Sequence, residues 1–212
     1  MYLPRHFAPA EAADMHRLMR AHPLACLVVH AGGQLLANHI PLLWVPASGA
    51  TGVLRGHVAR ANPLWRELDA DGLPALAVFQ GPQAYISPSW YPAKRQTGKV
   101  VPTWNYAVVH AHGRLRAVDD ARWVRDLVAA LTAEHEGRQP APWAVDDAPA
   151  DYIDAMVAAV VGIEMTVERL EGKFKASQNQ PEANRQGVEQ GLRKDPATVP
   201  MADLVRDAVR RS

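Results

Sequence analysis

The 212-residue sequence has a single cysteine, Cys26, which excludes an internal disulfide framework and a Cys-rich zinc site. Cys26 lies in the apolar run LACLVVH, where we expect an inert, buried thiol. A formal net charge of +1 argues against general nucleic-acid binding, which usually needs a strongly basic domain. No apolar stretch is long enough to span a membrane, and the start MYLPRHF has no secretory h-region. We therefore expect a soluble, cytoplasmic protein that does not bind membranes.

Several cofactor and metal motifs are also missing. The sequence has no GxGxxG or GxxxxGK[ST] motif and no strand–helix alternation, which excludes a parallel dinucleotide-binding fold. His57, His110 and His112 raise the question of a metal, but no Asp or Glu falls at a matching spacing and there is no HExxH. We therefore expect no metal site.

What is present is a series of short strands with few helices between them. We expect strands on both sides of Gly32-Gly33, at 53–58, 75–81 and 84–88, in a hairpin turning near His112-Gly113, and at 160–174. We expect helices at 9–22, from Pro63 after an Asn62 cap, from Asp119 or Asp120 to about 135, at 150–158, and in the polar tail from Pro181. This pattern predicts an α+β protein with an antiparallel barrel or sandwich core. We expect residues 1–180 to form one domain and 181–212 a helical extension packed on it.

The segment YISPSWYPAKRQTGKVVPTWNY, residues 85–106, holds five of the chain's aromatic residues on a basic loop broken by three prolines. Its Tyr and Trp rings could wall a flat ring system by stacking, or anchor a dimer interface. The two interpretations are compatible if a site lies between subunits.

Two further segments concentrate polar groups at strand ends. In ANHIPLLW, His39 lies on the strand face opposite Asn38 and Ile40, although a strand with one polar face explains this too. In LRGHVARANPLW, His57, Arg60 and Asn62 bracket a strand end and a helix start. Backbone N–H groups and a guanidinium there suit a phosphate, and a plain capped helix fits equally well.

The last polar segment is EGKFKASQNQPEANRQGV, from residue 171 to 188. Lys173 and Lys175 alternate with Phe174, so both ammonium groups point the same way, and four hydrogen-bonding side chains follow. This arrangement suits an anion or a heteroaromatic edge, with a solvated strand end as the alternative.

Taken together, MYLPRHF, NHIPLL, GHVARANPLW, YISPSWY, VPTWNY with VHAHG, and GKFKASQNQP…NRQGV…GL closely resemble the PaiB-like family. That family is described as FMN-binding negative transcriptional regulators of bacteria. The motifs occur in the family's order and extend from Met1 to about Leu192, whereas the last twenty residues match nothing.

The resemblance implies an antiparallel split β-barrel with flanking helices, related to pyridoxamine-phosphate-oxidase-like flavoproteins. It also implies a homodimer with FMN at the subunit interface, and the 85–106 loop as a wall near the flavin. The cofactor-binding residues it implies are His57, Arg60 and Asn62 on the phosphate side, Asn38, His39 and Ile40 along the flavin, Trp104 and Asn105 on the facing segment, and Lys173, Lys175 and Gln178 closing the site.

Three functions remain open from the sequence. The first is a flavin-binding repressor of transcription, although no convincing helix-turn-helix is present and direct DNA binding is left undecided. The second is an FMN-dependent oxidoreductase or flavin reductase that uses NAD(P)H on a small molecule, for which no catalytic residue can be assigned. The third is a haem-handling split barrel.

Overall fold

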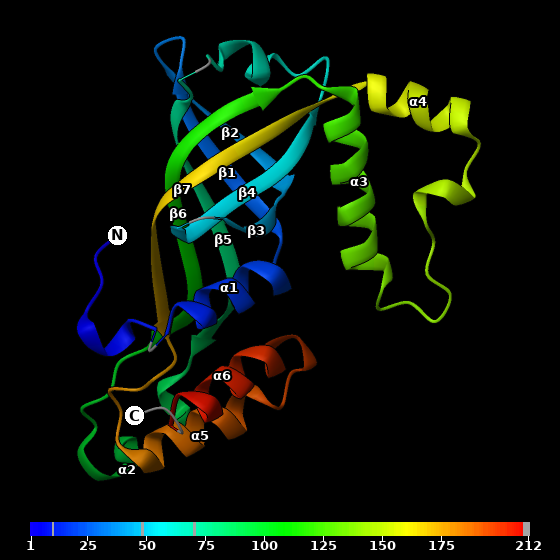
Figure 1. Cartoon of the computed structure of the whole chain (residues 1–212). Helices are drawn as coiled ribbons and strands as arrows, with labels where there is room; N and C mark the ends of the chain where they lie inside the picture. The colour runs from blue at the N-terminus through cyan, green and yellow to red at the C-terminus, as the bar shows by residue number, and fades with distance from the viewer. Residues whose placement is uncertain (10, 48, 70, 210–212) are drawn as a thin grey trace. The chain divides into compact units, whose positions relative to one another are not determined.

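The computed structural model describes residues 1–9, 11–47, 49–69 and 71–209. Its seven strands form one antiparallel sheet in the order β2-β1-β5-β6-β7-β4-β3 (Figure 1). The strands are β1 Leu24–Ala31, β2 Gln34–Pro41, β3 Leu43–Ala47, β4 Gly49–Ala59, β5 Leu73–Ile86, β6 Thr103–Val118 and β7 Val160–Lys175. The helices are α1 Ala12–Ala21, α2 Ala93–Thr97, α3 Ala121–Glu136, α4 Ala150–Ala158, α5 Glu182–Leu192 and α6 Val199–Val209, with short 3₁₀ turns between them.

The chain divides into two compact units, which are described separately. The first unit comprises Met1–His22, Phe79–His110 and the chain from Glu171 on. The second unit comprises Pro23–Val78 and Ala111–Leu170. Strands β5, β6 and β7 each continue from one unit into the other.

The β1–β2 hairpin of the second unit confirms the predicted turn. Gly32 and Gly33 both have positive φ, 56° and 74°, as a tight two-residue hairpin turn requires, and Ala31 pairs with Gln34 beside them. On the other side of β1, Cys26 pairs with Val78 of β5. Strand β4 lies between β3 and β7, with Leu54 opposite both Trp44 and Met165.

Two expectations about the long strands were wrong. The expected strands at 75–81 and 84–88 are one strand, β5, and the expected hairpin near His112-Gly113 is one continuous strand, β6. A Cβ at Gly113 would lie 1.9 Å from the Thr166 carbonyl oxygen. Gly113 therefore permits close approach of β7, not a turn.

Helices α3 and α4 of the second unit pack through a small apolar cluster. Asp120 caps α3 as predicted, because its side chain accepts a hydrogen bond of 2.7 Å from the Trp123 N–H. The cluster is formed by four buried residues, Val124, Val145, Ile153 and Val157. The Pro-rich connection between the two helices thus contributes Val145 to their packing.

Helices α5 and α6 of the first unit lie side by side (Figure 1). They confirm the predicted helical tail and bury their apolar faces with the end of β5 and the loop after it. The shared core contains Ile86, Tyr91, Val188, Leu192, Met201, Ala202 and Val205. The boundary expected near residue 180 stays a prediction. Within the described parts of the chain, no helix has the length and apolar character needed to cross a bilayer.

Candidate functional site

In the second unit, the ends of β2 and β4 bring two predicted residues together. The Asn62 side chain donates a hydrogen bond of 2.8 Å from Nδ2 to Asn38 Oδ1. Asn62 Oδ1 also accepts from the Leu64 N–H at 2.9 Å and so caps the 3₁₀ turn Pro63–Glu67, as predicted. Asn38 Nδ2 makes no hydrogen bond to the residues described. We call Asn38 and Asn62 the amide cluster.

The neighbouring side chains show the predicted alternation. Ile40 is buried, Asn38 is half-buried and His39 is exposed on the opposite face of β2. His57 on β4 is half-buried, and no described residue forms a hydrogen bond with its buried Nδ1 atom. Burial also lowers the pKa of His57, so the neutral imidazole is favoured. An unsatisfied ring nitrogen is the kind of group that a bound ligand or water satisfies.

Arg60 is held by hydrogen bonds to other residues of the second unit. Its Nη1 and Nη2 donate to the two carboxylate oxygens of Asp119 at 3.0 and 2.7 Å. Its Nε donates to the Ala158 carbonyl at 2.7 Å, and Nη2 also reaches the Val160 carbonyl at 3.2 Å. These bonds occupy four of the five guanidinium N–H groups, which leaves one on Nη1 for a phosphate. The phosphate contact of Arg60 stays a prediction.

In the first unit, Lys173 is a buried cation, 9% exposed. Its Nζ donates to the Tyr2 carbonyl at 3.1 Å and lies 5.5 Å from the ring centroids of both Tyr2 and Tyr106. Aromatic faces and a carbonyl thus compensate the charge, and no carboxylate in the described part of the chain pairs with it. Lys173 braces the end of β7 and does not present an open ammonium group.

Lys175, two residues on, is more open. Its Nζ donates to the Trp104 carbonyl at 2.7 Å and to Thr103 Oγ1. An ammonium has three N–H donors, so one has no partner among the described residues. Burial lowers the pKa of Lys175, Tyr106 raises it, and the charge of Lys173 lowers it further. We call Lys173, Lys175, Thr103 and Trp104 the lysine cluster.

Two exposed aromatic rings accompany the lysine cluster. Tyr85 and Trp104 form an edge-to-face pair, with ring centroids 6.2 Å apart and planes at 71°. Both are about half exposed, at 48% and 54%. The other aromatic residues of the 85–106 segment differ: Tyr91 is buried, and Trp90 packs on Gly191 of α5. Only part of the predicted aromatic wall is therefore available to a ligand or partner.

Asn105 and Gln178 are placed by the loop that follows β7. Asn105 is fully buried; its Nδ2 donates to Ser177 Oγ at 2.8 Å, and its Oδ1 has no partner among the described residues. Ser177 has φ of 62°, the left-handed region that costs strain for a residue with a Cβ. The Gln178 amide accepts from the Ala176 N–H at 2.7 Å and donates to the Phe174 carbonyl, so it braces this loop.

Sequence reasoning missed the roles of two of these residues. Asp119 was considered only as a helix cap, and its pairing with Arg60, 59 positions away, leaves no signal in one sequence. Ser177 adopts a conformation usually reserved for glycine or asparagine, so its identity gives no warning. Both hold predicted site residues in place.

The comparisons with known proteins concern the chain as a whole. The family model described as "Putative FMN-binding domain" matches residues 1–169. An uncharacterized protein of Emericella nidulans is 34% identical over 91% of this chain and 90% of its own length. Protease synthase and sporulation protein PAI 2 of Bacillus subtilis is 29% identical over 100% of this chain and 99% of its own.

Among solved structures, the FAD and haem binding protein from Mycobacterium smegmatis superposes with a TM-score of 0.55 at 17% identity. The match covers 79% of this chain and 72% of that one. At this identity the likeness establishes the fold alone. It confirms the α+β split β-barrel with flanking helices that the sequence predicts.

Proposed function

Because the chain belongs to the family of FMN-binding domains that its sequence matches, we propose that it binds FMN. The observation that carries the proposal is the lysine cluster, in which Lys175 keeps one uncommitted N–H and binds the backbone carbonyl of Trp104, whose exposed ring pairs with that of Tyr85. A phosphate needs a cationic donor, and an isoalloxazine ring needs a flat apolar face. The described residues therefore fit the chemical groups of FMN.

We assign the anionic part of the cofactor to Lys175. Thr103 and Trp104 fix two of its N–H groups, so the third has a set direction and loses little side-chain entropy on binding an anion. Lys173 keeps its charge close by without being consumed in an ion pair with a described carboxylate. Asn105 and Gln178 then act by holding this loop in shape.

The amide cluster offers a different kind of group. Asn38 and Asn62 present neutral amides, with Ile40 as an apolar neighbour on β2. His57, on β4, offers an unsatisfied ring nitrogen of its own. These are the groups that recognise a heteroaromatic edge by hydrogen bonds. We propose this role for Asn38 and Asn62, and we propose the last N–H of Arg60 as a further contact to the phosphate. His39, on the opposite face of β2, takes no part in the contact of Asn38.

When bound, FMN supplies hydride and electron transfer by itself, so the protein needs to supply only binding, orientation and exclusion of water. We propose redox turnover with NAD(P)H as the reductant. The substrate would be a small molecule that reaches the flavin face left open.

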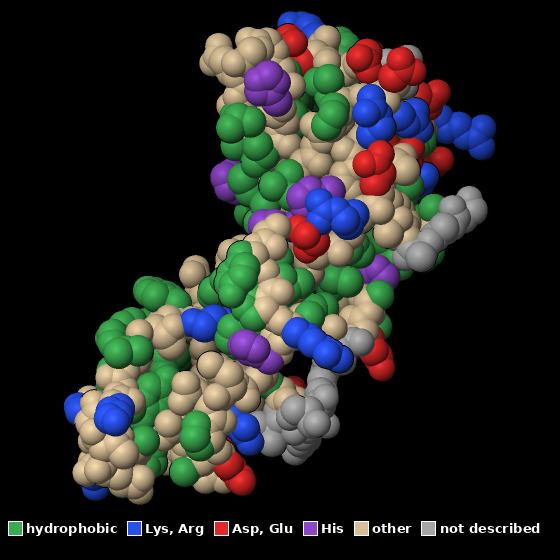
Figure 2. Space-filling model, turned by 90° about the vertical axis from the view of Figure 1, so that its left-hand side faces the viewer, with side chains coloured by type: hydrophobic (Ala, Val, Ile, Leu, Met, Phe, Trp, Pro, Cys, Tyr) green, Lys and Arg blue, Asp and Glu red, His purple; other side chains and the backbone are tan. Residues whose placement is uncertain are grey.

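A role as a transcriptional regulator is the second candidate. Its support is the resemblance of the sequence motifs to the PaiB-like family, and the relative from Bacillus subtilis that matches nearly the whole of both chains is named for protease synthesis and sporulation. Direct base reading by α5 and α6 has little support. Arg193 pairs with Glu189 and Asp203, and Arg206 pairs with Asp203 and Asp207. On the face shown in Figure 2, basic and acidic side chains are interspersed. Regulation would then act through a partner or the flavin's redox state.

We propose a homodimer on the strength of the exposed apolar groups around the lysine cluster. Tyr85, Trp104 and the 74%-exposed Val101 lie on or next to the same segment. Aromatic residues of this kind commonly anchor interfaces. Sedimentation with and without FMN tests this directly.

One experiment separates the two functions. Protein loaded with FMN is mixed anaerobically with NADH or NADPH, and then exposed to air. Bleaching within seconds to minutes and recolouring support the oxidoreductase. A flavin that stays oxidised with both reductants contradicts the oxidoreductase and supports the regulator. A salt-dependent shift of promoter DNA would add direct DNA contact to that role. A Soret band on haem titration instead of retained flavin would contradict both.

A further inference from the structure

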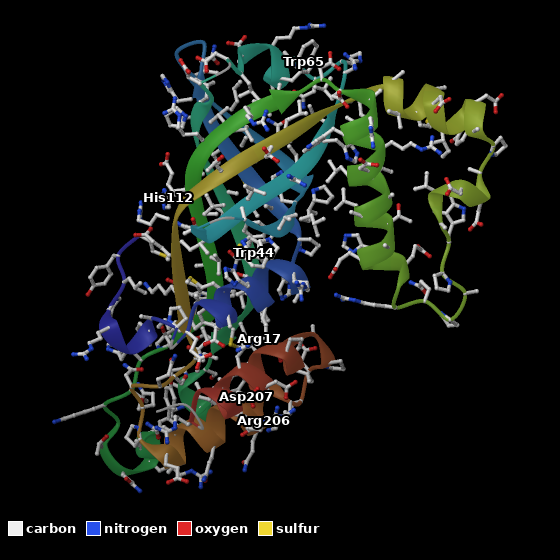
Figure 3. The ribbon with its side chains drawn as sticks, in the orientation of Figure 1. Arg17, Trp44, Trp65, His112, Arg206 and Asp207 are labelled. Atoms are coloured by element: carbon white, nitrogen blue, oxygen red, sulfur yellow. The ribbon has the colours of Figure 1, made fainter. Side chains whose placement is uncertain are left out.

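A pocket of about 560 Å³ lies in the first unit, between α1 and α6, with the end of β7 as its floor. The residues that define it are Leu18, Arg17, Phe174, Leu204, Asp203 and Asp207. In Figure 3, Arg17 lies on the side of α1 that is turned toward α6, where Asp207 is labelled. The volume is that of a small-molecule site, about 300–1,000 Å³. Nothing in the proposed FMN chemistry requires this pocket, which we call the α1–α6 pocket.

Most of the pocket wall is apolar. Leu18 of α1, Phe174 of β7, Leu204 of α6 and Pro82 of β5 line it together with several alanines. Contact between an apolar wall and an apolar ligand body removes both surfaces from water, which favours binding. The ligand is therefore expected to carry an aromatic or aliphatic body.

The charges in the wall are mainly acidic. Three aspartates and one arginine line the pocket, and the arginine, Arg17, is already paired with Asp14. Burial lowers the pKa of His22, another lining residue, which disfavours a positive charge there. The two other carboxylates are Asp203 and Asp207, whose arginine partners do not line the pocket.

Asp203 and Asp207 are four residues apart on α6 and therefore share one helix face. Arg193 and Arg206 both bind Asp203 through Oδ1, at 2.9 and 3.1 Å. Arg206 binds Asp207 through Oδ1 at 3.1 Å. In each carboxylate, Oδ2 has no partner among the described residues. Two open carboxylate oxygens, one helical turn apart, suit the N–H donors of one ammonium group.

We propose that the α1–α6 pocket binds a primary amine with an apolar body, its ammonium group at Asp203 and Asp207 and its body against Leu18, Phe174 and Leu204. The site is separate from FMN binding, although Gln178 belongs to the walls of the pocket and to the predicted cofactor residues. The pocket sets the ligand class because it has two carboxylates at one end of an apolar cavity. These call for one cationic group on an apolar body.

The test uses two matched probes, tryptamine and indole-3-propionate, which share an indole body and carry opposite charges. Calorimetric titration of the full chain saturated with FMN is expected to give one tryptamine site per chain. Indole-3-propionate is expected to bind at least about tenfold more weakly, as a reversed charge interaction implies. Equal binding of the two probes, or binding of neither, would overturn the proposal.

Variants then locate the site. Asp207→Asn is expected to weaken tryptamine about tenfold, and the matched control Asp126→Asn on exposed α3 to leave it unchanged. Leu204→Trp fills the cavity and should abolish binding. Ala21→Leu, at an exposed lining position on α1, does so with less risk to folding, which circular dichroism checks. Unchanged binding in both filled variants would refute the location. Competition between tryptamine and FMN would show that the pocket belongs to the cofactor and refute a separate site.

Discussion

The backbone of Gly113 in β6 lies so close to Thr166 in β7 that a Cβ at position 113 would be 1.9 Å from the Thr166 carbonyl oxygen. The glycine is therefore a packing requirement between two neighbouring strands of the second unit. A substitution at Gly113 therefore tests whether β6 is one continuous strand, where the sequence had predicted a hairpin.

Gly113→Ala should destabilise the protein by more than about 3 kcal/mol, because the added methyl group meets backbone that cannot move aside alone. Urea unfolding followed by circular dichroism measures the change. Gly98→Ala is the control: it has positive φ, 66°, with open space around it, so only backbone strain of about 1–2 kcal/mol is expected. Equal losses in the two variants would contradict the close packing of β6 on β7.

The sequence could predict elements whose cause is local. Gly32-Gly33 demands a tight turn, and Asn62-Pro63 demands a cap, and both are present. It could not distinguish Gly113 as a turn residue from Gly113 as a close-approach residue, since both uses select glycine.

The candidate site also combines features that the sequence predicts locally with features that depend on distant residues. The sequence motif identified Lys173 and Lys175 as candidates. It could not show that Tyr2 occupies Lys173 while Thr103 and Trp104 leave one N–H of Lys175 open, because these partners are distant in sequence. The burial of Tyr91 and the packing of Trp90 likewise depend on α5 and α6. Long-range partners of this kind leave no trace in a single sequence.

Lys175→Met should weaken FMN about tenfold to a hundredfold and riboflavin less than about twofold, because riboflavin lacks the phosphate that this ammonium group would bind. Flavin fluorescence quenching measures both affinities. Lys99→Met, at an exposed position of the same basic loop, is the control and should change neither. If Lys175→Met weakens both flavins alike, the lysine contacts the ring or only supports the loop.

Arg60 and Asp119 form a pair that can be tested from both sides. Arg60→Ala should weaken FMN more than riboflavin, since it removes the remaining N–H as well as the tie to Asp119. Asp119→Asn should preserve or strengthen FMN binding, because it reduces the competition for the guanidinium. Both variants should lower the melting temperature. Identical effects on the two flavins in Arg60→Ala would restrict Arg60 to holding the fold together.

Glu164 gives a prediction for pH. Burial raises its pKa, but hydrogen bonds from Arg116 and Arg55, at 2.5 and 2.8 Å, outweigh burial and leave the pKa below its usual value. The carboxylate therefore adds stability at pH values above about 4.5, its ordinary pKa, and loses it as the pH falls through the lowered value. Glu164→Gln should be less stable than the parent at pH 7, with the gap narrowing in acid. The exposed control Glu168→Gln should follow the parent, and a constant gap from pH 7 to pH 3 would contradict the ion-pair account.

Cofactor retention tests the central claim most directly. Purified protein is incubated with excess FMN and passed over a gel-filtration column, and the spectrum of the protein peak is recorded. FMN binding predicts a flavin band near about 450 nm that elutes with the protein at about one flavin per chain. A protein peak without flavin, with all of the FMN in the small-molecule fractions, would contradict it.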